Sequence, residues 1–174
     1  MTAARRGHTL GLSLDIAPPA REVLEEARLR YEPTAGDMLP HVTVLPPIDV
    51  DEDALPAVLA HLESVARATA PFTLALAGTG TFRPVSPVVF VALSQGGPDC
   101  TSLERRARSG DMAVETRFPY HPHVTIAHDV AGAVLDRAQS DLADFEATMH
   151  MASMGLYENR DGQWGLLREF AFEA

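Results

Sequence analysis

The chain has 174 residues, of which 46% are hydrophobic and 22% charged, and its formal net charge is −10. The length suits one domain of ordinary globular composition, and the negative charge argues against a protein that binds long nucleic acid by neutralising phosphates. The single cysteine, Cys100, excludes a disulfide within the chain and favours a cytoplasmic setting, and no apolar run approaches the roughly 20 residues of a membrane-spanning helix.

The first half of the chain predicts two helices and three strands. Four aliphatic residues alternate over residues 8–16 and predict a strand with one buried face. A Pro-Pro pair then opens a helix over residues 21–31. Acidic residues at its start and apolar residues at helical spacing predict a second helix over residues 49–70. Residues 71–82 and 86–95 predict an antiparallel strand hairpin, because only a short turn separates them.

The second half repeats this mixture. A short helix over residues 98–110 ends at a glycine, and residues 131–147 predict a further helix with one apolar face. Two strands, residues 147–159 and 162–174, close the chain around the turn signal Asn-Arg-Asp-Gly. Helices combined with largely antiparallel strands predict an α+β fold.

One phrase occurs twice: Pro-His-Val-Thr begins at Pro40 and again at Pro122. The histidines, His41 and His123, are 82 residues apart, about half of the chain, which indicates internal duplication. No flexible linker separates the halves. We therefore interpret residues 1–174 as a single domain of two lobes.

A doubled His-x-Thr pattern on strands suits phosphodiester chemistry. Side chains alternate along a strand, so the histidine and threonine share one face while β-branched residues anchor the other. Across one cleft, one imidazole accepts a proton while the other donates, and the hydroxyls bind the non-bridging phosphate oxygens. This chemistry requires neither a metal nor a covalent intermediate. A single motif would favour a structural role, whereas two matching copies favour function.

The segments PHVTVLPP and PHVTIAH resemble the paired signatures of the 2H phosphoesterase superfamily, which includes the bacterial 2′-5′ RNA ligase family and the cyclic phosphodiesterases. The likeness extends to residues 8–16, 78–93 and 117–128 and to the closing strands. It implies a bilobal 2H phosphoesterase (LigT-like) fold of two largely antiparallel sheets with flanking helices and pseudo-two-fold symmetry around a central cleft. It also implies metal-independent opening of 2′,3′-cyclic phosphates or cleavage of 2′-5′ phosphodiesters, the reverse ligation, a role in RNA processing, and no cofactor.

By this resemblance, His41 and His123 are the acid–base pair, and Thr43 and Thr125 hold the substrate phosphate. Five residues after the second motif histidine, relatives often carry Arg or Tyr, whereas this chain has His128. Strict strand alternation turns His128 away from its motif unless a bulge or the end of the strand intervenes. We expect it to bind phosphate if it is turned inward.

Three further side chains are candidates for substrate contact: His121, Phe82 and Tyr120. His121 shares strand parity with the motif histidine, and the two aromatic residues fit stacking on a base or packing in the core equally well. Trp164 is expected in the core or at a lobe edge. Three arginines are candidates for charge near the cleft, although surface positions suit them better: Arg83, Arg117 and Arg160.

Two other interpretations remain open. His121, His123 and His128, with His41 and Asp129, could form a metal site, but their spacing fits no compact zinc pattern and leaves the threonines unexplained. Alternatively, the protein is a non-catalytic module that binds a nucleotide or an RNA end in the same cleft. In either case the expected partner is a small nucleotide or RNA end, and the expected state is a monomer.

Overall fold

The structure is a computed structural model that describes residues 7–36 and 38–174. The strands are β1 (Gly7–Asp15), β2 (His41–Asp51), β3 (Phe72–Thr81), β4 (Val88–Gln95), β5 (His123–His128), β6 (Glu146–Met151), β7 (Ser153–Arg160) and β8 (Gln163–Ala171). The helices are α1 (Ala20–Tyr31), α2 (Leu55–Arg67), α3 (Gly97–Ala107) and α4 (Gly132–Asp141), with short 3₁₀ turns η1 (Glu52–Ala54) and η2 (Gly110–Met112).

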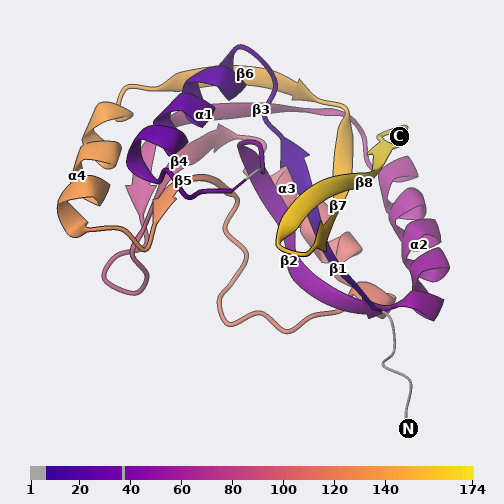
Figure 1. The fold of residues 1–174 in the computed structure, drawn as a ribbon. Coiled ribbons are helices and arrows are strands. Elements are labelled where there is room, and N and C mark those ends of the chain that lie inside the picture. Colours follow the sequence, from indigo (N-terminus) through magenta and orange to yellow (C-terminus); the bar gives the residue numbers. More distant parts are fainter. Residues whose placement is uncertain (1–6, 37) are drawn as a thin grey trace, which may run out of the picture.

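The strands form one curved sheet in the order β6-β3-β4-β5-β2-β1-β7-β8, and every neighbouring pair is antiparallel. The predicted α+β fold is confirmed, and Figure 1 shows the helices flanking the sheet. The two sheets expected from the sequence are present as two four-stranded halves. They are joined at the centre by the single register pair Val42↔Val124 between β2 and β5, so the sheet is continuous.

The helix expected over residues 131–147 ends at Asp141, because Glu146 and Ala147 already belong to β6 and pair with β3. Two further element predictions were wrong in their boundaries. The single strand expected over residues 147–159 is interrupted at Ala152, because β6 pairs with β3 in one half while β7 pairs with β1 and β8 in the other. The helix expected from residue 49 begins later, because Val50 and Asp51 pair with the start of β1. In both places strand pairing overrides the local pattern.

The four helices cover the face of the sheet opposite the motif side chains. α1 and α4 contact β5, whereas α2 contacts β8 and α3 contacts β2. α1 lies between β1 and β2 in the chain but packs on β5, and α3 lies between β4 and β5 but packs on β2. Each repeat thus supplies a helix to the strand of the other. This interlocking supports the prediction of a single domain, which stays a prediction.

Within the described ranges, no helix has the length and apolar character needed to cross a bilayer. The cytoplasmic location stays a prediction. Cys100 is fully buried, and burial raises its pKa to about 12. Its thiol therefore stays protonated near neutral pH and is a core group rather than a nucleophile.

Candidate active site

The two His-x-Thr motifs, His41–Thr43 and His123–Thr125, lie on the neighbouring central strands. Residues directly opposite each other in an antiparallel pair point to the same face, and their chain neighbours point to the other face. Val42 and Val124 are such a pair, and both are fully buried against the helices. The histidine and threonine of both motifs therefore project from the open face, with each histidine across from the threonine of the other motif.

Each motif histidine is oriented by a carbonyl group two residues before it. Nδ1 of His41 lies 2.7 Å from the oxygen of Leu39, and Nδ1 of His123 lies 2.6 Å from the oxygen of His121. A carbonyl oxygen only accepts, so both Nδ1 atoms carry a proton, and Nε2 of each neutral ring is an acceptor. In the described part of the chain, neither Nε2 atom nor either motif hydroxyl has a hydrogen-bond partner. All four groups are available to a ligand.

Both motif strands carry a β-bulge directly after the threonine. The register pairs around the bulges are Ser13↔Thr43 then Leu12↔Leu45 for β1–β2, and Phe90↔Thr125 then Val89↔Ala127 for β4–β5. The extra residues are Val44 and Ile126. Equivalent bulges at equivalent positions extend the internal symmetry beyond the repeated phrase to the neighbouring strands.

His128 follows the second bulge. The bulge puts two successive residues on the buried side, so strand alternation returns His128 to the face of His123. Its ring is held by two carboxylates: Nε2 lies 3.2 Å from Oε1 of Glu32, and Nδ1 lies 3.1 Å from Oδ2 of Asp129. The expected contact of His128 with a substrate phosphate stays a prediction.

The second motif histidine lies among aromatic rings. The ring centroids of Phe82, Phe90 and His121 are 4.9, 5.1 and 5.7 Å from that of His123. Gly80 makes room for this cluster, since a Cβ atom there would come within 2.6 Å of the Phe90 ring. The structure thus brings two predicted residues, Phe82 and His121, to the motif. Their contact with a substrate stays a prediction.

A carboxylate and a phenol hydroxyl lie beside the first motif histidine instead. Asp15 is the register partner of His41 across β1–β2, and its Oδ2 accepts a hydrogen bond of 2.5 Å from the hydroxyl of Tyr157. The equivalent partner of His123 on β4 is Ala92. A carboxylate therefore stands next to one motif histidine and not at the equivalent position of the other.

These surroundings act on the pKa values of both rings. Burial is the largest influence and lowers the pKa of His41 and of His123, while their backbone hydrogen bonds raise it. At His41, the charge of Arg28 lowers the pKa and the carboxylate of Asp15 raises it. At His123, the charges of His121 and His41 lower the pKa further. Asp15 therefore favours a proton on His41 and Arg28 opposes it, whereas both named charges at His123 oppose a proton.

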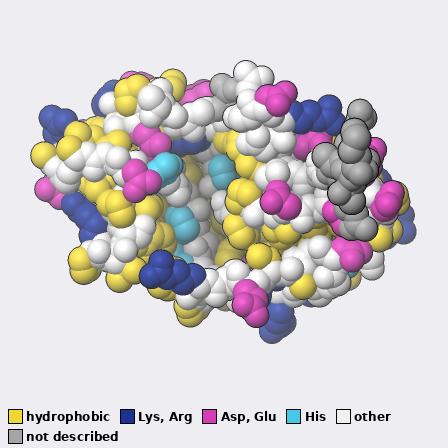
Figure 2. All heavy atoms as spheres, turned by 60° about the horizontal axis from the view of Figure 1, so that its bottom comes forward, with side chains coloured by type: hydrophobic (Ala, Val, Ile, Leu, Met, Phe, Trp, Pro, Cys, Tyr) yellow, Lys and Arg dark blue, Asp and Glu magenta, His cyan; other side chains and the backbone are white. Residues whose placement is uncertain are grey.

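One face of the molecule is hollowed, and Figure 2 shows histidine side chains gathered in and beside this hollow. Next to His41 is a recess of about 180 Å³. We call it the Trp164 recess; its lining includes Ser13, Met38, His41, Thr43, Tyr157 and Trp164. The sequence had indicated a core or lobe-edge position for Trp164. The residue instead forms a wall of the recess beside His41.

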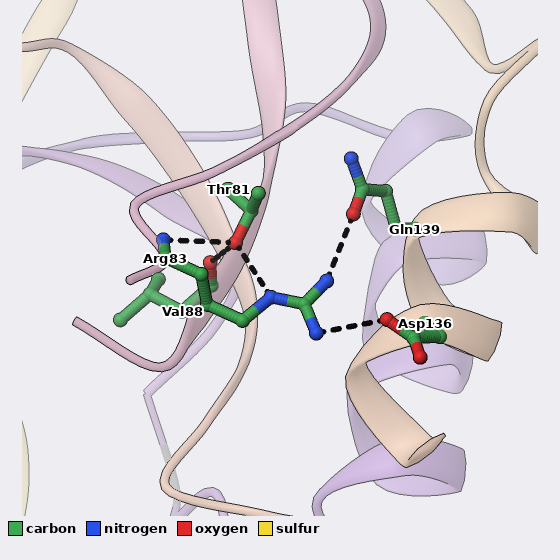
Figure 3. Close-up of polar contacts among 5 residues, drawn as sticks. All are labelled: Thr81, Arg83, Val88, Asp136 and Gln139. Carbon is green, nitrogen blue, oxygen red and sulfur yellow. Dashed lines mark hydrogen bonds and ion pairs between the residues drawn. The ribbon is translucent and has the colours of Figure 1, made fainter. Parts of the chain in front are cut away.

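Arg83 is held in the loop between β3 and β4. Its guanidinium donates to Oγ1 of Thr81 at 3.1 Å, Oδ1 of Asp136 at 2.8 Å and Oε1 of Gln139 at 3.1 Å (Figure 3). These contacts tie the loop, which begins with Phe82, to α4. Arg83 therefore positions the ring that packs on His123, and its charge is taken up by protein groups.

Three other candidates are also engaged by the protein. The hydroxyl of Tyr120 donates to the carbonyl oxygen of Thr43 at 2.8 Å and links the loop before β5 to β2. The guanidinium of Arg117 lies over the ring of Phe118, and Arg160 pairs with a nearby glutamate at 2.6 Å. A substrate contact by Tyr120 stays a prediction.

Among the described residues, no three His, Cys, Asp or Glu side chains are grouped so that they could hold a metal ion. The metal-site interpretation thus has no set of ligands in this part of the chain. His121 and His123 are neighbours, but His128 is engaged by Glu32 and Asp129 instead.

Sequence reasoning missed Asp15, Ser13 and Tyr157. A signal for the last was present: Gly155-Leu156-Tyr157 repeats the Gly-x-aromatic pattern of Gly80-Thr81-Phe82. Gly155 pairs with Ser13, the β1 residue across from Thr43. Gly80 likewise pairs with Phe90, the β4 residue across from Thr125. The role of Asp15 depends on its register against His41, which the sequence does not contain.

Comparison with known proteins agrees with this geometry. The sequence model of a family described as the 2′-5′ RNA ligase superfamily matches residues 16–163. A protein of Bacillus cytotoxicus named "Putative phosphoesterase" is 27% identical over 159 residues, which cover 87% of this chain and 91% of that protein. A protein of Bacillus mycoides with the same description has the same identity and coverage.

Solved structures show the same fold at lower identity. A crystal structure of E. coli LigT complexed with 3′-AMP has a TM-score of 0.71 at 20% identity and covers 97% of this chain and 100% of its own. The structure of TT0787 from Thermus thermophilus has a TM-score of 0.62 at 21% identity and covers 95% and 98% of the two chains. E. coli LigT has also been crystallised with NADP⁺ and with ATP.

Proposed function

This chain belongs to the 2′-5′ RNA ligase superfamily of 2H phosphoesterases, and we propose that its cleft hydrolyses 2′,3′-cyclic phosphates or 2′-5′ phosphodiesters of small nucleotides or RNA ends. The family makes it a phosphoric diester hydrolase. One observation carries the finer proposal: two Nε2 atoms and two threonine hydroxyls, all without protein partners in the described residues, project from one face of two adjoining strands.

In the proposed reaction, His123 is the base and His41 the acid. Nε2 of His123 takes a proton from a water whose oxygen attacks phosphorus, and the protonated Nε2 of His41 donates to the departing ribose oxygen. The new P–O bond replaces the broken one, and the product is a phosphate monoester and a free hydroxyl. The two rings then regain their starting protonation states by exchange with solvent.

The assignment rests on the neighbours of the two rings. The carboxylate of Asp15 favours a proton on His41 against the opposing charge of Arg28, whereas His123 faces Ala92 and the rings of Phe82 and Phe90. Thr43 and Thr125 donate to the non-bridging oxygens and keep phosphorus between the rings. Each histidine lies across from the threonine of the other motif, so the two rings stand diagonally on either side of a phosphorus held by the hydroxyls; in-line attack needs the base and the acid on opposite sides.

The test is turnover of 2′,3′-cyclic mononucleotides and 2′-5′ dinucleotides, with the position of the product phosphate assigned by phosphorus NMR. We expect a monoester to form at the same rate with and without EDTA. Loss of activity on chelation would favour the metal-site interpretation.

The second candidate is a module that binds a nucleotide or an RNA end without turnover. E. coli LigT, which has this fold, has been crystallised as complexes with 3′-AMP, ATP and NADP⁺. A shift of melting temperature on adding a cyclic nucleotide, with no monoester released, would support binding alone.

A further inference from the structure

The two repeats differ most at the ends of the sheet. β8 continues along β7 as far as the pair Arg160↔Gln163 and so runs beside Tyr157. The equivalent partner in the other half, β6, stops at the pair Ala77↔Glu146, before the position of Phe82. The first motif therefore has an additional wall that the second motif lacks.

That wall is Trp164, which pairs with Asn159 on β7. Its ring lies over Gly11, where an added Cβ would be 3.4 Å from the Trp164 Cζ3 atom. The residue is half-buried, and its indole N–H has no hydrogen-bond partner in the chain as described. A large aromatic side chain with an unused donor thus lines a recess that His41 and Thr43 also line.

The size and lining of the Trp164 recess define its ligand. About 180 Å³ is below the roughly 300–1,000 Å³ of pockets that enclose a whole drug-sized ligand, so it suits one ring system. Aromatic walls with few free polar groups favour stacking, which every nucleobase offers. The polar groups beside it are engaged, since Tyr157 and Ser13 both bond to Asp15.

We propose that the Trp164 recess binds the nucleobase of the nucleoside whose phosphate lies at His41, mainly by stacking on Trp164 with little selection among bases. This inference rests on the proposed function, because it takes the phosphate to lie between the motifs. It also fixes the orientation of the bound substrate, because its base then lies on the β8 side of the cleft and not on the side of Phe82.

Trp164 is the only tryptophan in the chain, so intrinsic fluorescence reports on this residue alone. Titration with 3′-AMP should quench the fluorescence, and inorganic phosphate should not. Quenching of equal size by inorganic phosphate, or no quenching by saturating 3′-AMP, would contradict a base on Trp164.

A kinetic experiment separates this inference from the proposed function. The substrates are 2′,3′-cyclic AMP and ribose 2′,3′-cyclic phosphate, which lacks the base. Trp164→Ala should raise KM for cyclic AMP on the order of tenfold, the cost of one lost base–aromatic stack, with kcat unchanged. KM for the base-free substrate should not change.

Two further variants serve as controls. Trp164→Phe keeps an aromatic ring and should retain most of the affinity. Leu166→Ala, on the same strand, removes an exposed side chain and should behave as the unmodified protein.

The outcomes are distinct. If the unmodified protein opens neither cyclic phosphate but 3′-AMP still quenches its fluorescence, the proposed function fails and the base site stands. If both substrates are opened and Trp164→Ala changes KM for both equally, or for neither, the base site is wrong and the function stands.

Discussion

The two halves of the cleft carry the same motif in different surroundings. His41 and His123 share strand geometry, tautomer and following bulge. The residue across from His41 is Asp15, whereas Ala92 stands across from His123. The repeated motif thus places two similar imidazoles side by side, and the neighbouring strands give only one of them a carboxylate across the register; the proposed roles of acid and base depend on this difference. A symmetric pair would have no preferred direction of proton transfer.

The motif histidines should carry the largest effect. His41→Ala and His123→Ala should each reduce kcat by roughly 10²–10⁴-fold, the contribution of one general acid or base, in turnover of 2′,3′-cyclic AMP. The fold should persist, because Val42, Val44, Val124 and Ile126 anchor the strands from the buried face. The control is His150→Ala, on the exposed side of β6. Near-full activity in either motif variant would remove that residue from the mechanism.

The threonine hydroxyls should come next. Thr43→Val and Thr125→Val keep the branched shape and remove only the hydroxyl, which has no partner among the described residues. Losing a hydrogen bond to a charged oxygen costs about 1.5–3 kcal/mol, so kcat/KM should fall roughly 10–150-fold. Thr148→Val, an exposed position on β6, is the matched control. Unchanged kcat/KM would show that the hydroxyls do not reach the phosphate.

Asp15 tests the difference between the halves. The pKa of both motif histidines is lowered, so kcat/KM should be bell-shaped in pH with its maximum below about 6.5, the ordinary value for histidine. Asp15 raises the pKa of His41, so Asp15→Asn should lower that pKa further. If His41 is the acid, it loses its proton at lower pH, and the alkaline limb moves to lower pH while the acidic limb stays.

A shift of the acidic limb instead would reverse the roles, making His41 the base. A profile with one limb would contradict a two-histidine mechanism altogether. Tyr157→Phe is the control for packing, since it keeps the ring against Gly155 and removes only the hydrogen bond to Asp15.

Local pattern sufficed for much of this molecule. The strand and helix types, the hairpin of β3 and β4, and the sharing of one face by each histidine and threonine follow from spacing alone, because alternation is a property of the backbone. What the sequence does not contain is register between distant strands. Asp15 meets His41 only through the pairing of β1 with β2, and Trp164 reaches the cleft only because β8 continues beside Tyr157. The interruption at Ala152 likewise depends on which strands lie alongside.

Substitution of Arg83 should have the smallest effect on kcat/KM. It should move the acidic limb of the pH profile, whereas Asp15→Asn should move the alkaline limb. Its ion pair with Asp136 is partly exposed, so it contributes at most about 1 kcal/mol to stability, but it holds the loop of Phe82 against His123. Burial lowers the pKa of His123; in Arg83→Ala the looser ring admits water, and that pKa should rise toward its ordinary value. The base then stays protonated to higher pH, so the acidic limb of kcat/KM should move to higher pH while the alkaline limb stays, and the loss of activity should be confined to acidic pH. Arg83→Lys, which retains a charge for Asp136 but not the three-way contact, should lie between. If Asp15→Asn and Arg83→Ala move opposite limbs of the pH profile, each limb belongs to one half of the cleft. If both variants move the same limb, the two histidines titrate as one unit, and their surroundings do not set the direction of proton transfer.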